Sequence, residues 1–98
     1  MLFIATLSHE PADCWARPEN ERRAREWIAE LPERADRHDV DLRGAYVTPT
    51  EHTFYIVVEA EDYAAAASFL GGALLEDHDG EIAPILPLEE GRSVLFED

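Results

Sequence analysis

Three histidines and one cysteine are the side chains in this sequence whose types and spacing suggest chemistry. All four lie in segments that separate apolar runs of the 98-residue chain: His9, Cys14, His52 and His78. Neutral imidazole nitrogens and a thiolate are ligands that zinc and copper accept in proteins. We therefore predict that, if this protein binds a transition metal, the metal is zinc or copper held by these four residues.

Two other interpretations of these residues stay open. Histidines in polar loops are often solvated or cap helices, and a lone loop cysteine is often structural. His9 and Cys14 can also be considered as a nucleophile pair, although no residue is placed to orient the histidine as a base. The sequence lacks the GxGxxG, GxxxxGK[ST], HExxH, CxxC and GxSxG motifs, which argues against the enzyme classes that depend on them.

The elements that must position these residues can be predicted from periodicity and turn residues. The apolar run 2–8 has β-compatible residues at both parities, which is typical of a central strand covered on both sides. Apolar residues at helical spacing predict a helix over 19–38, with Pro32 at a kink or a fresh turn. The later elements are a strand over 40–47, a turn over 48–51, a strand over 52–60, a helix over 63–70 that is capped by Asp62 and ended by Gly71 and Gly72, and a strand over 81–88.

This β-α-β-β-α-β order predicts a single α+β domain over residues 1–98 with a ferredoxin-like fold. Right-handed crossovers then give a four-stranded antiparallel sheet of order 4-1-3-2 with both helices on one face. The core is expected within residues 2–88. The tail 89–98 carries an apolar patch, Val94 to Phe96, that adds a strand or docks on a neighbour. Because the first two strands run opposite to the last two, the four candidate ligands gather at one end of the sheet, and His38 lies at the other.

The register of the predicted hairpin decides which residues face the helices. Folding the segment about Thr50 places Tyr46 near Phe54 and Leu42 near Val58, so that one face is apolar except for the Tyr46 phenol. On the opposite face, which no helix covers, we expect Ala45, Val47, Tyr55 and Val57. An uncovered apolar sheet face usually marks an interface, so the sequence predicts a homodimer or higher oligomer through this face.

Four residues are candidates for contact with a small ligand. Arg43 lies near Asp41 and Glu59 of the hairpin, which predicts a local ion-pair bridge across the hairpin. Together with Tyr55 it could instead orient a small anion in a cavity between subunits. Tyr46 is expected in the core, with its hydroxyl reaching a partner at the layer edge. Trp15 is expected either to pack over the end of the core or to line the mouth of a pocket.

The charge of the chain is strongly negative. Twenty-two acidic residues oppose eight arginines, there is no lysine, and the net charge is −14. Repulsion between so many negative charges destabilises a small domain at ordinary ionic strength and is screened in molar salt. The composition therefore predicts a salt-rich, halophilic environment. The alternative is an acidic face for a cationic partner or for mimicry of a nucleic acid. Direct binding of nucleic acid is not expected, because no basic patch is available.

The compartment follows from three further observations. No apolar run approaches the roughly 18 residues of a membrane span, so no membrane partner is expected. The segment Met1–Leu7 has no basic residues before it, which argues against a signal peptide. Cys14 has no second cysteine with which to form an intrachain disulfide, which fits a reducing compartment. We therefore expect a cytoplasmic protein.

Several short motifs carry a resemblance to a known superfamily. They are Thr6-Leu7-Ser8-His9-Glu10-Pro11 with Cys14, Gly44-Ala45-Tyr46, and Pro49-Thr50-Glu51-His52. Over residues 2–88 the chain resembles the dimeric α+β barrel superfamily and, within it, small uncharacterised archaeal and bacterial families. The resemblance implies two open sheets that pair around a small cavity. The superfamily includes cofactor-free monooxygenases, lactone isomerases and haem-dependent enzymes, but no haem-ligating or isomerase signature matches here residue by residue.

These features favour a homo-oligomeric module that binds a small ligand or a metal, or serves as an assembly unit, over an enzyme. The alternative is a small cofactor-free enzyme, monooxygenase-like or isomerase-like, with its active site in the cavity at the open sheet face. A cavity above about 300 Å³ with converging polar groups favours ligand binding or catalysis, whereas a large dry contact between sheets favours assembly. Zinc and copper are the only cofactors that these residues indicate.

Overall fold

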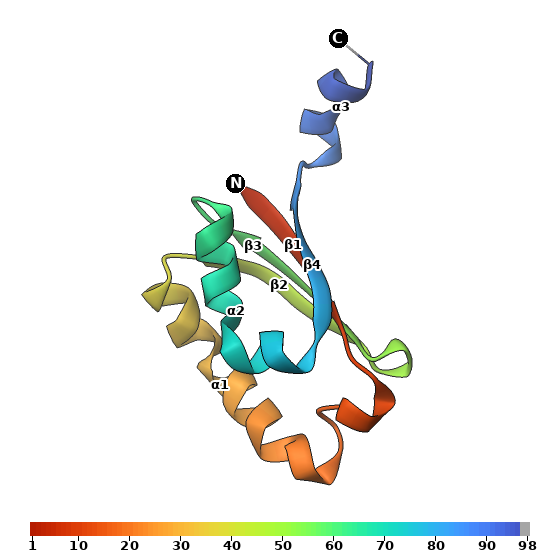
Figure 1. Cartoon of the computed structure of the whole chain (residues 1–98). Helices are drawn as coiled ribbons and strands as arrows, with labels where there is room; N and C mark the ends of the chain where they lie inside the picture. Colours follow the sequence, from red (N-terminus) through yellow and green to blue (C-terminus); the bar gives the residue numbers. More distant parts are fainter. Residues whose placement is uncertain (97–98) are drawn as a thin grey trace.

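The computed structural model describes residues 1–96 and has an α+β fold built on a four-stranded antiparallel sheet (Figure 1). Helices α1 and α2 cover one face of the sheet, and α3 extends from its end. The elements are β1 (Leu2–Ser8), α1 (Glu21–Arg37), β2 (Asp41–Thr48), β3 (Thr53–Glu59), α2 (Tyr63–Asp77), β4 (Asp79–Ile85) and α3 (Leu88–Phe96). The predicted α+β class and four-stranded antiparallel sheet are confirmed. The strands lie in the order β2-β3-β1-β4, which is 4-1-3-2 counted from the opposite edge.

The core lies between the sheet and the two covering helices. Phe3, Ala5 and Leu7 of β1 are buried, whereas the residues between them are only half-buried, so a single chain covers one face of this strand. Two-sided cover of the central strand, which the apolar run suggested, is therefore not present within one chain. Most of the deeply buried side chains of the core come from helix α2. Helix α1 is joined to α2 by Trp27, which donates from Nε1 to the carbonyl of Leu70 at 3.0 Å.

The β2–β3 hairpin contains a bulge that changes its register. Leu42 pairs with Val58 as predicted, but Gly44 pairs with Val57, so Arg43 has no partner in the ladder. From Gly44 onward the predicted register is wrong by one residue. The physical reason is the bulge itself, which inserts one extra residue into β2 and shifts all later pairs.

The shifted register exchanges the faces of the residues after the bulge. Tyr46 pairs with Tyr55 on the face that no helix covers and is 64 % exposed, so the expected core tyrosine is wrong. Val47 pairs instead with Phe54, and both line a cavity with Ile28 of α1. Val47, like Ala45, therefore faces the helices, and the prediction that placed both on the open face is also wrong.

Helix α2 is longer than predicted because it resumes after Gly71. This glycine has φ 81° and ψ 163°, which interrupts the helix where the sequence predicted its end. Arg34 of α1 fills the space beside Gly71 and donates to the freed carbonyls of Phe69 and Ser68 at 2.8 and 3.2 Å. The second half of α2 then continues to Asp77 and delivers the chain to β4. At its start, Asp62 accepts from the backbone nitrogen of Ala65 at 2.9 Å, which confirms the predicted cap.

The C-terminal tail forms a helix, which corrects the expectation that its apolar patch adds a strand. Helix α3 projects beyond the end of the sheet (Figure 1), and residues 97–98 of the predicted tail lie outside the described residues. The radius of gyration is 14.8 Å, compared with about 12.6 Å for a compact domain of this length. Within residues 1–96, no helix has both the length and the apolar character needed to cross a bilayer.

Candidate metal centre

At one end of the sheet, the last residue of β1 lies beside the first residues of β3 and β4. Ser8 pairs with Thr53 on β3 and with Asp79 on β4. The chain neighbours of these three residues are His9, His52 and His78. Pairing of the strands therefore brings together three imidazoles from distant parts of the sequence, and the backbone nitrogen of His9 donates to the carbonyl of His52 at 3.2 Å.

The loop after β1 brings Cys14 back toward the histidines. A 3₁₀ turn over Pro11–Asp13 precedes Cys14, and the next residue, Trp15, is buried. Trp15 donates from Nε1 to Oδ2 of Asp77 at 2.9 Å, and Arg23 donates to the same oxygen. These bonds tie the loop to the C-terminal end of α2 and keep Cys14 beside the imidazoles.

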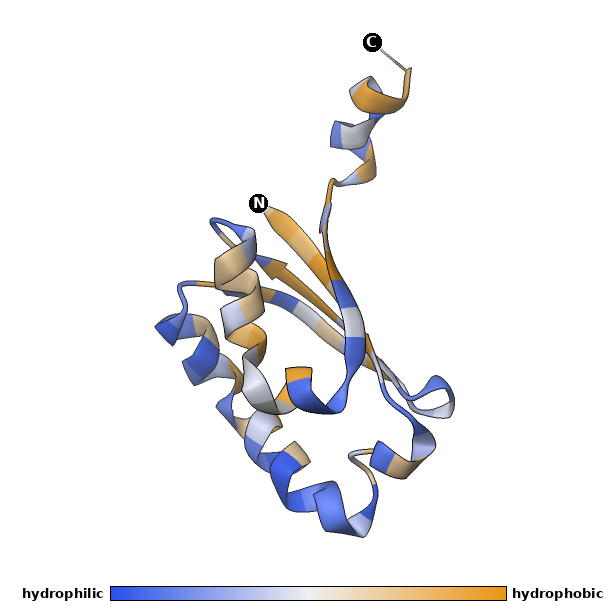
Figure 2. Ribbon diagram, in the orientation of Figure 1, coloured by the Kyte–Doolittle hydropathy of each residue, from blue (hydrophilic) through white to orange (hydrophobic). Residues whose placement is uncertain are grey.

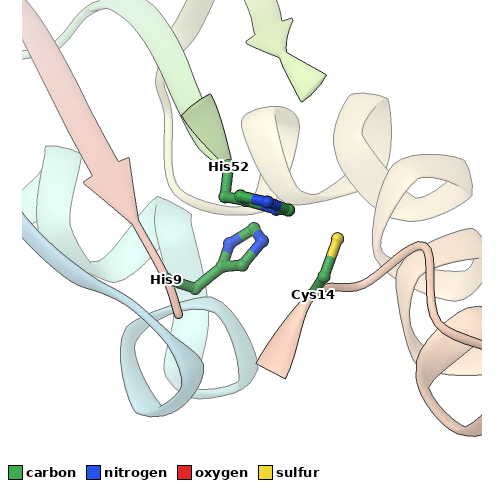
Figure 3. A group of neighbouring side chains, drawn as sticks. All are labelled: His9, Cys14 and His52. Carbon is green, nitrogen blue, oxygen red and sulfur yellow. The ribbon is translucent and has the colours of Figure 1, made fainter. Parts of the chain in front are cut away.

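Three of the four predicted ligands converge on one point. One ligand atom from each of His9, Cys14 and His52 lies within 4.8 Å of the other two, and all three residues are partly buried. Figure 3 shows the side chains pointing toward one another from separate chain segments. Bonds of about 2.0–2.3 Å at tetrahedral angles would place such atoms roughly 3.3–3.6 Å apart. A shift of about 1 Å in side chains would therefore close them around a metal ion.

His78 stands next to this group but outside it. Its ring lies edge-to-face against the ring of His9, with centroids 4.8 Å apart. Its Nδ1 lies 2.7 Å from the carbonyl oxygen of Leu74, and since a carbonyl only accepts, Nδ1 carries the proton of the neutral ring. The other nitrogen, Nε2, is left with a lone pair in a buried position.

Four buried imidazole nitrogens of this cluster have no hydrogen-bond partner among the described residues. They are Nδ1 and Nε2 of His9, Nδ1 of His52 and Nε2 of His78. Buried polar atoms in folded proteins are nearly always bonded, and each exception calls for an explanation such as an ion. The donor set of nitrogens and one sulfur therefore fits a transition metal.

The surroundings lower the pKa of two of the imidazoles. For His9, burial is the largest cause, and the neighbouring imidazoles of His78 and His52 act in the same direction. For His78, burial lowers the pKa more than the Leu74 carbonyl and Asp77 raise it. Both rings are therefore neutral at neutral pH, which is the state that binds a metal.

The backbone of His52 is held in an unusual conformation. It follows the 3₁₀ turn Pro49–Glu51 and has φ 52° and ψ 44°, in the left-handed region. Few residues other than glycine adopt this conformation, and such strain is concentrated at functional sites. The conformation reverses the chain just before β3, with the His52 imidazole turned toward His9 and Cys14 (Figure 3).

A cavity of about 430 Å³ adjoins the cluster on the helix side of the sheet. The ligand triad His9, Cys14 and His52 forms part of its lining, and most of the remaining wall is apolar. The apolar residues include Trp15, Ala24, Ile28, Val47 and Phe54. Trp15 fulfils both of its predicted roles, because it is only 4 % exposed and also lines the cavity. This cavity lies on the helix side of the sheet, within one chain. The cavity expected at the open face would lie between two chains and stays a prediction.

The other predicted ligand contacts lie elsewhere. Arg43 bonds to Asp41 at 2.9 Å, as half of the predicted bridge, while Glu59 meets the N-terminal ammonium. Tyr46 and Tyr55 face each other on the open sheet face. The structure therefore brings none of Arg43, Tyr46 and Tyr55 to the cluster.

His38 also lies away from the cluster, as predicted. It ends α1 just before β2, whose first residue pairs with Glu59, the partner of Leu2 at the opposite end of β1.

Asp77 is the site residue that the sequence interpretation missed. Asp77 accepts a hydrogen bond from Trp15 and directly precedes His78 in the chain. This position next to a candidate ligand was the only sign in the sequence that Asp77 belongs to the site. Its contact with Trp15 spans 62 residues and depends on how α2 resumes after Gly71.

The sequence matches, over residues 1–97, a family described as Domain of unknown function (DUF3303). No curated protein and no solved structure matches the chain. The family description states no activity, so a function has to be inferred from the site.

Proposed function

The chain belongs to the family Domain of unknown function (DUF3303), and from the geometry of its site we propose that it is a homo-oligomeric module that binds zinc or copper(I). The observation that carries this proposal is the convergence of two imidazoles and a thiol within 4.8 Å, next to buried nitrogens that lack partners. Zinc accepts mixed nitrogen and sulfur ligands, and the thiolate favours copper(I).

The proposed ligands are His9, Cys14 and His52, with His78 as a positioning residue. The edge-to-face contact between His78 and His9 supports this role, because it restricts the orientation of the ligating ring. Three protein ligands leave one position of a tetrahedral metal open, which is typical of sites that take a further ligand. The adjoining cavity of about 430 Å³ provides room for one.

The second candidate function is binding or conversion of a small apolar molecule without a metal. The cavity supports this candidate because its volume exceeds about 300 Å³ and its polar groups gather at one end. A cofactor-free enzyme of this kind would use His9 and Cys14 as its reactive groups. Retention of metal by the purified protein separates the two functions.

The oligomeric part of the proposal concerns the uncovered face of the sheet. We assign the fold to the ferredoxin-like class and propose that two copies associate through this face, as in the dimeric α+β barrel superfamily. Half-buried apolar residues such as Ile4 and Val57 support the assignment, since one chain leaves them partly accessible. The acidic, lysine-free composition and the lone Cys14 support a halophilic, cytoplasmic setting.

Titration calorimetry of metal-free protein tests the metal site directly. Zinc is titrated in buffer, and copper(I) is titrated without oxygen in competition with a chelator. We expect one site per chain, and substitution of any ligand, as in His9→Ala, Cys14→Ser or His52→Ala, should weaken binding by more than about 100-fold. Loss of a positioning residue costs about 10–100-fold, so His78→Ala should fall in that range.

His38→Ala is the matched control, because it removes an imidazole at the opposite end of the sheet. It should bind as tightly as the unmodified protein. Equal and weak binding by the protein and all variants would contradict the proposal and leave these side chains as ordinary loop residues.

A further inference from the structure

The cavity beside the ligand triad continues into a second cavity on the same side of the sheet. This second cavity has a volume of about 200 Å³ and shares Ile28, Val47 and Phe54 with the cavity of about 430 Å³. Its lining also includes Leu31 of α1 and Ile56 of β3, which lie further along these two elements. Figure 2 shows that β3, which lines both cavities, is apolar over most of its length. We call the two adjoining cavities the slot.

The slot leads away from the ligand triad along the sheet. His52 directly precedes β3, and the chain then passes Phe54 in the first cavity and Ile56 in the second. Four residues of a strand cover roughly 13 Å. On β2, Val47 pairs with Phe54 and Ala45 pairs with Ile56, so this strand follows the slot in the same direction. The triad therefore lies at one end of an elongated space.

The polar side chains that a ligand could meet are those of the triad. The described residues that line the slot include no acidic residue and no arginine. Two indoles line it, but the Nε1 of Trp15 donates to Asp77 and the Nε1 of Trp27 donates to the carbonyl of Leu70. Tyr46 borders the second cavity, and strand pairing turns its side chain to the uncovered face of the sheet. A polar group far from the triad would thus meet no free side-chain partner among the described lining residues.

We propose that the slot binds a small apolar molecule that carries a single nitrogen or sulfur donor, and that this donor occupies the open position of the metal. The inference rests on the proposed metal site and names the chemical class of its further ligand. Nitrogen and sulfur donors suit both zinc and copper(I). The apolar body of such a molecule would be removed from water against the walls of the slot, which favours binding in proportion to the area buried.

The size of the slot suits a small molecule. Pockets for small molecules in proteins usually have volumes of about 300–1,000 Å³, and the first cavity alone measures about 430 Å³. Since a water molecule takes up about 30 Å³ of liquid, this volume holds on the order of ten non-hydrogen atoms. The second cavity then provides room for a longer apolar chain.

Three pyridines that differ in one feature each test the class of ligand. They are pyridine, para-butylpyridine and para-butylpyridine with a hydroxyl at the end of its chain. Calorimetry of the metal-loaded protein measures their affinities, and cobalt(II) in place of zinc reports through its visible spectrum whether the pyridine nitrogen reaches the metal. The butyl chain should tighten binding by at least about 30-fold, because it buries four further carbons. The terminal hydroxyl should reduce this affinity by at least about 10-fold, because it loses water without gaining a partner.

Substitutions of alanine on α1 test the place of binding. Ala24 lines the slot, so Ala24→Phe should fill part of it and weaken binding of para-butylpyridine by at least about 10-fold. Val47→Phe is a second filling variant at a position that is 50 % exposed and tolerates a larger side chain. Ala29→Phe is the matched control, because it makes the same change at an exposed position of the same helix outside both cavities. It should bind para-butylpyridine as the unmodified protein does.

Metal affinity and circular dichroism of each variant separate loss of the probe from loss of the metal or of the fold. A metal-loaded protein that binds pyridine and para-butylpyridine equally, or binds neither, would overturn the inference and leave the metal site standing. Equal binding of para-butylpyridine with and without metal would also overturn it, in favour of the second candidate function. If the protein takes up no metal, the proposed metal site and this inference are both wrong.

Discussion

Two adjacent glycines in α2 should respond in opposite ways to the same substitution. Gly71 has φ 81° and ψ 163°, in a region that other residues rarely adopt, and the guanidinium of Arg34 occupies the place of a Cβ. Gly72 is helical, and a Cβ added to it would meet no atom within 4 Å. We predict that Gly71→Ala destabilises the protein and that Gly72→Ala stabilises it.

The expected magnitudes follow from these surroundings. Backbone strain at such a position costs about 1–3 kcal/mol. The new methyl group would also displace Arg34 from the carbonyls of Phe69 and Ser68, and hydrogen bonds to a charged group contribute about 1.5–3 kcal/mol each when buried. Arg34 is only partly buried, so a total loss of about 3–5 kcal/mol is expected. At Gly72 a gain of about 0.5–1 kcal/mol is expected, because alanine loses less conformational entropy in a helix.

Urea unfolding followed by circular dichroism measures both changes. For a domain of this size each kcal/mol corresponds to about 4–8 °C in Tm, so Gly71→Ala should lower Tm by more than 10 °C. The near-ultraviolet signal of Trp15 gives a second readout, because its partner Asp77 lies in the part of α2 that follows the kink. Stability changes of the same sign in both variants, or a loss below about 0.5 kcal/mol for Gly71→Ala, would refute the role assigned to Arg34 and the kink.

The remaining predictions concern solution conditions. Burial and neighbouring imidazoles hold the pKa of His9 below its ordinary 6.5, and burial does the same for His78. The unfolded chain therefore binds more protons than the folded one below pH 6.5, so the metal-free protein should lose stability as pH falls from 7.5 to 5. Urea titrations at several pH values measure this, and a flat profile would contradict it. The net charge of −14 predicts a lower Tm in 10 mM than in 2 M KCl; an unchanged Tm would remove the halophilic interpretation.

The arrangement of the candidate site could be anticipated in part from the sequence. His9, His52 and His78 each adjoin a strand end, and antiparallel strand directions alone place those ends at the same end of the sheet. The approach of Cys14 could not be anticipated. It depends on a loop held by the Trp15–Asp77 bond, a contact between residues 62 positions apart that leaves no local pattern.

The fold class, the order of the elements and the capped start of α2 followed from the sequence itself, because apolar periodicity and turn residues act over a few neighbouring positions. The faces of the hairpin did not. Residues 44–47 are apolar or small at both parities, so periodicity does not choose between registers, and the bulge at Arg43 is decided by pairing with β3. Only the tertiary structure reveals that Arg34 lets α2 continue beyond Gly71, since this requires two helices to meet. The exposed position of α3 is likewise known only from the tertiary structure, in which none of the described residues of this helix is buried.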